Sequence, residues 1–176
     1  SSCGALWEAL RAAGGGGGEE RSAADGSSSA ERFYWVDMFA VAQNRGPHQA
    51  ADLDFETVIA AAQRTVAIFD SWADPAMLRR CWCLHELHCT HEAGKPLAVA
   101  MPPADAAALR GAVAANFGSL LMTQTACIDS ERAVATMPDD QARILGAIRD
   151  GCGFKELNLQ VLTLLNAWLR SVAAAH

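Results

Sequence analysis

Residues Thr65–Met101 decide the fold, and they read TVAIFDSWADPAMLRRCWCLHELHCTHEAGKPLAVAM. The first five residues are apolar or β-branched, which is typical of a buried strand. Asp74 and Pro75 then predict the start of a helix, because proline suits the first helical turn. Gly94 ends this helix, and Pro96–Met101 predicts a second strand. The stretch therefore predicts two parallel strands joined by a crossover helix.

The same alternation extends toward the N-terminus. Residues 33–39, FYWVDMF, predict another buried strand, and Asp52 or Asp54 is expected to cap a helix through residues 55–62. The expected fold is α/β, a flavodoxin-like three-layer parallel sheet with crossover helices. Ligands of such sheets bind at the carboxyl ends of the strands. The candidate site residues at those ends are Asp37, Phe39, Asp70, Ser71 and Trp72.

The rest of the chain divides by composition into further segments. Residues 1–13 predict a helix, and the Gly- and Ser-rich residues 14–30 predict a flexible linker. Residues 31–130 are expected to form the α/β domain, and residues 131–176 are expected to form helices that pack on it. The five glycines at 14–18 follow no strand, so they do not meet the conditions for a dinucleotide-binding turn.

Beyond Met101 the pattern becomes helical. We expect a helix over Ala104–Ala115, a strand within Leu120–Ile128 and a helix over Asp139–Asp150. The last helix carries an apolar stripe at helical spacing, which we expect to close the core rather than to form a dimer seam. This stripe consists of Phe154, Leu157, Val161, Leu164, Leu165 and Trp168.

Composition and charge narrow the function classes. The net charge of -6 and the pI near 5.3 argue against a broad basic surface, so we expect no binding to nucleic acid. No apolar run approaches the roughly 18 residues needed to cross a bilayer, and the N-terminal segment lacks the layout of a signal peptide. We therefore expect a cytoplasmic protein without membrane insertion, whose six cysteines are reduced thiols.

The expected helix Leu78–Glu92 divides into two sides. On a helical wheel of ~100° per residue, the side expected to pack on the sheet carries Met77, Cys81, Leu84 and His88. The opposite side carries Arg79, Trp82, Cys83 and Glu86. The sheet alone cannot enclose Glu86, so the loop after Phe39 or a second protomer is expected to complete any pocket.

The helix also carries a recognisable motif, Trp82-Cys83-Leu84-His85-Glu86-Leu87. With the order of strands and helices over Phe33–Met101, it resembles the Toll/interleukin receptor (TIR) domain, most closely its plant-type members. Residues 34–37, YWVD, with Gln43-Asn44 are similar to a signature of fungal heterokaryon-incompatibility domains. The TIR sheet starts with a strand that has no counterpart before Cys3, so we expect this strand upstream of Ser1 or lost through divergence.

The resemblance implies that Glu86 is the catalytic glutamate of an NAD+ glycohydrolase, with NAD+ as substrate and no metal or cofactor. It also implies self-association with homotypic domains, which forms a composite site. The chemistry of NAD+ supports a single catalytic carboxylate independently of the resemblance. The nicotinamide is already cationic, so it leaves without a general acid. One carboxylate can then stabilise the developing oxocarbenium ion. The candidate substrate-binding residues are Asp37, Phe39, Asp70, Ser71, Trp72, Trp82 and Cys83.

Two other interpretations remain open. A non-enzymatic TIR-like interaction module would use Arg79 and Glu86 as surface contacts. A zinc site on Cys81, His85 and His88 has suitable ligand types, but its spacing matches no paired zinc pattern. Turnover of NAD+ separates the first alternative from the enzyme, and metal analysis tests the second.

Overall fold

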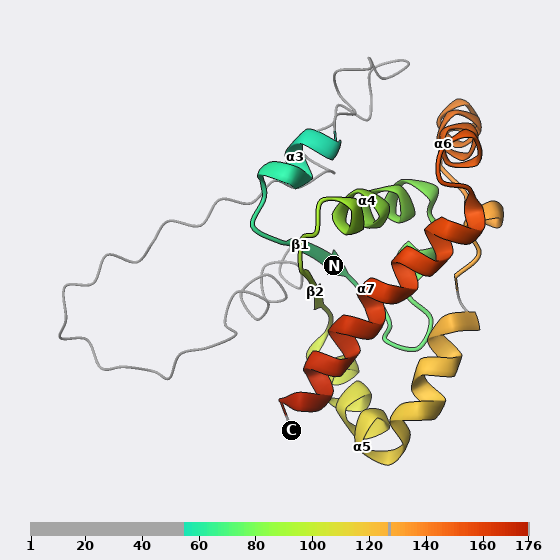
Figure 1. The fold of residues 1–176 in the computed structure, drawn as a ribbon. Helices are drawn as coiled ribbons and strands as arrows, with labels where there is room; N and C mark the ends of the chain where they lie inside the picture. The colour runs from blue at the N-terminus through green and yellow to red at the C-terminus, as the bar shows by residue number, and fades with distance from the viewer. Residues whose placement is uncertain (1–54, 127, 176) are drawn as a thin grey trace, which may run out of the picture.

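The computed structural model describes residues 55–126 and 128–175 (Figure 1). The predicted helix 1–13, the linker 14–30, the strand 33–39 and the capping aspartates lie outside the described residues. The described elements are α3 (Phe55–Ala61), β1 (Thr65–Ile68), the 3-10 helix η2 (Ala76–Arg79), α4 (Cys81–Glu92), β2 (Leu97–Ala100), α5 (Pro103–Ala126), the 3-10 helix η3 (Ser130–Arg132), α6 (Pro138–Asp150) and α7 (Phe154–Ala174).

The strands β1 and β2 pair in parallel, in a register that places Thr65 opposite Leu97 and Ile68 opposite Ala100. Two further backbone bonds extend the pair, since the Phe69 N–H donates to the Ala100 carbonyl at 2.9 Å and the Thr65 N–H donates to the Pro96 carbonyl at 3.1 Å. The helix α4 is the crossover between these strands. The α/β prediction is therefore confirmed for the strand, helix and strand of Thr65–Met101.

The helix α4 begins later than predicted. Pro75 leads into η2, and Arg80 then adopts an extended conformation with φ -102° and ψ 122°. A long-range contact holds this break: the Cys81 N–H donates to the Val134 carbonyl at 3.0 Å, and the Val134 N–H donates to the Arg79 carbonyl at 2.9 Å. The prediction of one continuous helix over Leu78–Glu92 is thus wrong at its N-terminal end.

The helix α5 contains a kink that explains a second difference. Asn116 has φ -161° and ψ 86°, and its side chain accepts a hydrogen bond from the Ser119 N–H at 2.9 Å. Asn116 thus caps the second half of α5. The predicted helix Ala104–Ala115 is confirmed, whereas the predicted strand within Leu120–Ile128 is wrong because the chain continues as helix to Ala126.

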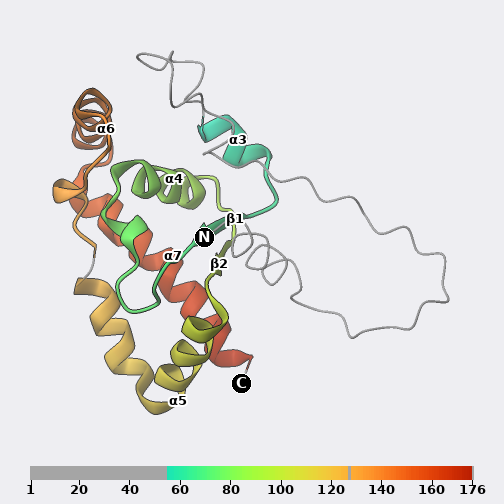
Figure 2. The same cartoon turned by 180° about the vertical axis from the view of Figure 1, so that it is seen from behind.

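The helix α7 closes the core. It packs against α4, α5 and β2, and the two views show it running obliquely past the strand pair (Figures 1 and 2). Its fully buried residues are Leu157, Val161, Leu165 and Leu169. The Trp168 ring meets the Phe69 ring edge-on, with centroids 5.8 Å apart. The prediction that this stripe closes the core is confirmed, and α6 confirms the predicted helix Asp139–Asp150. Within the described ranges, none of the helices is long and apolar enough to cross a membrane.

Candidate functional site

The helix α4 buries two of its sides, each in a different cluster. Cys81, Leu84 and Leu87 belong to the main core beside α7 and the sheet. Cys89 belongs to a second, small cluster whose other buried members are Phe55 and Ile59 from α3. The helix α3 therefore covers a side of α4 that the helical wheel left facing away from the sheet.

Trp82 lies where α3 and α6 both approach α4. Its ring is tilted against the Phe55 ring, with centroids 5.4 Å apart. The Arg143 guanidinium of α6 lies 5.2 Å from the centre of the same ring, within the range of a cation–π interaction. The half-buried indole is thus held from two elements, as a ring that contacts a ligand must be.

Glu86 lies between Trp82 and Cys89 on this side of the helix. The three residues are four and three positions apart, so their Cβ atoms share one helical face. Glu86 is half-buried, and its Oε1 atom is shielded from solvent. The wheel placed Glu86 correctly with Trp82, opposite Leu84 of the core. Its backbone carbonyl accepts the Thr90 hydroxyl at 2.8 Å, which fixes this turn against Thr65 of β1.

Burial and nearby carboxylates determine the electrostatics of the Cys89 thiol. Burial raises the pKa of the Cys89 thiol to about 12, and the negative charges of Glu56 and Glu86 add to this increase. Both carboxylates are therefore close enough to Cys89 to disfavour its thiolate. Burial likewise lowers the pKa of the His85 imidazole, and positive charge on His88 adds to that decrease.

The Cys89 sulfur and the His85 Nε2 atom are 3.8 Å apart, but the pair is not arranged for nucleophilic catalysis. A nucleophilic cysteine needs a lowered pKa, and the pKa of Cys89 is raised. Within the described part of the chain, Cys81, Cys89 and Cys152 form no disulfide. Cys83 is half-buried one position from Trp82. Among the residues that the structure describes, no three His, Cys, Asp or Glu side chains are grouped to hold a metal ion.

Asp70, Ser71 and Trp72 lie at the carboxyl end of β1, as predicted. The Asp70 carboxylate accepts the Ala76 N–H at 2.9 Å and so caps η2. The Trp72 N–H donates to the Asp105 carboxylate at 3.3 Å, and its side chain packs against the main core. Glu86 faces the other side of α4, so the structure does not bring these residues together with it. Asp37 and Phe39 lie outside the described residues.

The buried side-chain amide of Gln160 joins α4 to α7, a contact that the sequence did not lead us to predict. The Gln160 Oε1 atom lies 2.6 Å from Nδ1 of His88. The Gln160 Nε2 atom donates to Glu92 at 2.9 Å and to Glu156 at 3.4 Å. The available signal was a polar residue between Leu157 and Leu164 on an otherwise apolar stripe. These contacts fix His88 in a structural network rather than in a ligand set.

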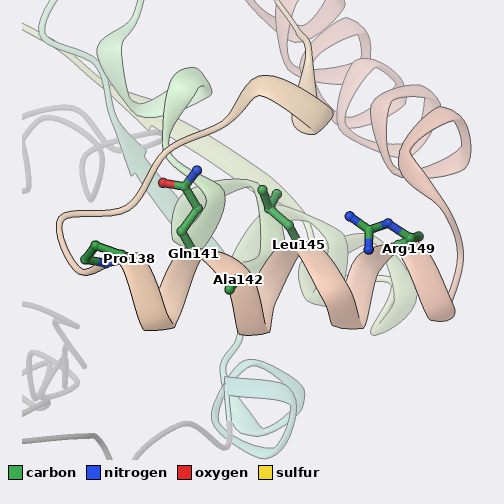
Figure 3. Close-up of a pocket in the computed structure, with 5 residues that line it drawn as sticks. All are labelled: Pro138, Gln141, Ala142, Leu145 and Arg149. Carbon is green, nitrogen blue, oxygen red and sulfur yellow. The ribbon is translucent and has the colours of Figure 1, made fainter.

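A shallow hollow of about 360 Å³ lies on α6, away from Glu86. Figure 3 shows its lining side chains along this one helix. They are Pro138, Gln141, Ala142, Leu145 and Arg149. None of them comes from α4, so this hollow does not contain the candidate carboxylate.

Comparison of the chain with protein-family models, curated proteins and solved structures gives no match. The assignment of function therefore depends on the residues and geometry described above.

Proposed function

We propose that the chain is a TIR-like signalling domain whose Glu86 cleaves NAD+ and releases nicotinamide after self-association. The observation that carries this proposal is the position of the half-buried Glu86, which lies one helical turn after Trp82 and opposite Leu84 of the main core. In this proposal the sheet is a flavodoxin-like parallel sheet with crossover helices, of which β1, α4 and β2 are a part.

The chemistry follows from the substrate. The bond between C1' of the ribose and the nicotinamide nitrogen breaks, and its electron pair neutralises the pyridinium. The Glu86 carboxylate accepts hydrogen bonds from ribose hydroxyls and stabilises the cationic sugar as that bond lengthens. Water then adds at C1' and loses a proton, which leaves ADP-ribose. The Trp82 ring, which the Arg143 guanidinium of α6 holds in place, contacts an aromatic ring of the substrate.

Self-association supplies what one copy lacks. Asp70, Ser71 and Trp72 lie on the far side of α4 from Glu86, so in this proposal they contact the substrate from a neighbouring copy. The partners are therefore homotypic domains, and the site of action is the cytoplasm. Cys83, Asp37 and Phe39 remain proposed substrate contacts.

The second candidate is a TIR-like interaction module without catalysis. It is favoured by the packing of α3 on this side of α4, where Phe55 and Ile59 form a buried cluster with Cys89. In this alternative, Arg79 and Glu86 are contacts of the interaction surface.

The experiment that tests the proposal measures nicotinamide release from NAD+ over a series of protein concentrations. Wild type, Glu86→Gln and the matched control Glu131→Gln are compared, since Glu131 is exposed on η3. We expect release that rises more than linearly with protein concentration, equal in wild type and control and absent in Glu86→Gln. Assembly without release in any of the three proteins would instead favour the interaction module.

A further inference from the structure

The helix α3 is attached to the described chain through a small cluster of its own. Its buried side chains are Phe55 and Ile59, which meet Cys89 on α4. This cluster shares no buried residue with the main core, and the half-buried Trp82 borders both. Figures 1 and 2 show α3 beside α4 and apart from α5 and α7. The helix can therefore separate from α4 without opening the main core.

The surface beneath α3 is the side of α4 that carries Glu86. Phe55 packs on Trp82 one turn before Glu86, and Phe55 and Ile59 pack on Cys89 one turn after it. The path from Trp82 to Cys89 runs between His85 and Glu86, so these contacts place α3 beside the Glu86 position. The half-buried state of Glu86 agrees with this placement.

The attachment of α3 is weak because the element is short. The helix has seven residues, which is too few to be stable in isolation. Its buried contribution is limited to Phe55 and Ile59.

We infer that α3 is a cap that closes the Glu86 side of α4 and lifts to open it. The purpose of this opening rests on the proposed function, because a closed cap keeps substrate from the Glu86 carboxylate. Substrate access is then controlled by the position of α3, and a second copy approaches Glu86 only when the cap is lifted.

Two buried thiols on α4 provide the test. Cys81 is fully buried in the main core, and Cys89 is 4% exposed beneath α3. Folded protein is treated with N-ethylmaleimide, and the labelling rate of each cysteine is followed by peptide mass spectrometry. We expect Cys89 to react before Cys81 in the wild type, because lifting α3 exposes Cys89 alone. Phe55→Ala should speed labelling of Cys89 by about a hundredfold and leave Cys81 unchanged.

Carbodiimide coupling of an amine measures access to the carboxylate itself. We expect Phe55→Ala to increase modification of Glu86 and to leave the exposed Glu131 unchanged, whereas Leu159→Ala on the outer side of α7 should alter neither. Equal rates at Cys89 and Cys81 in both proteins would overturn the cap, as would faster Cys89 labelling without greater modification of Glu86. Neither measurement uses NAD+, so a failure of the proposed catalysis is recognised separately by the absence of nicotinamide release.

Discussion

Replacement of Leu165 by alanine tests whether α7 closes the core on which α4 rests. Leu165 is 0% exposed within the main cluster. Truncating a fully buried leucine removes apolar contacts and leaves a cavity, which costs about 3–5 kcal/mol. The described part of the chain has the size of a domain whose total stability is about 5–15 kcal/mol. Leu165→Ala should therefore remove about a fifth or more of the free energy of unfolding.

The assay is urea unfolding followed by helical circular dichroism, with Leu159→Ala as the matched control. Leu159 lies on the same helix, but its side chain is 56% exposed, so the same truncation should cost less than about 0.5 kcal/mol. With a urea dependence of about 2 kcal/mol per molar, the midpoint of Leu165→Ala should fall by about 1.5–2.5 M. Equal midpoints for the two variants would refute the buried position of the Leu165 side of α7.

Two further predictions concern pH and capping. The pKa of Cys89 is about 12 in the folded state against 9.0 ordinarily, so the unfolded chain releases this proton first. The contribution of Cys89 to stability is therefore full below pH 9.0 and is lost as the pH rises toward 12. Cys89→Ala should flatten the decline of the urea midpoint over this window, and an unchanged slope would contradict the assigned burial. Asp70→Ala should lower stability by about 1 kcal/mol through loss of the cap on Ala76, whereas Asp74→Ala, which removes an exposed ion pair with Arg79, should leave stability nearly unchanged. Equal thermal shifts for the two aspartate variants would rule out the capping role.

The sequence predicted the elements whose signals are local. Thr65–Met101 carries β-branched runs, a proline suited to a helix start and a glycine stop, and the parallel pair with its crossover helix follows from them. The apolar stripe of α7 could also be predicted from the sequence, because helical spacing over 21 residues has few alternative explanations. The wheel also placed Glu86 correctly with Trp82, since helical geometry alone fixes which residues share a side.

The differences arise where distant residues decide the conformation. Arg80 is extended because Val134 pairs with the backbone on either side of it, and no local signal marks that partner. Residues 120–126 continue as helix although their short apolar run also suits a strand, and run length alone does not separate the two. The cover beside Trp82 and Cys89 is likewise tertiary, because α3 reaches them through Phe55 and Ile59 from a separate segment.

The central claim is that the Glu86 carboxylate does chemistry on NAD+. The most direct measurement is the rate of nicotinamide release by concentrated wild-type protein and by Glu86→Gln, which removes the negative charge and keeps the size of the side chain. We predict release by the wild type and a loss of about a hundredfold or more in the variant, the magnitude that removal of one charge-stabilising group produces. Equal rates in the two folded proteins would contradict the claim.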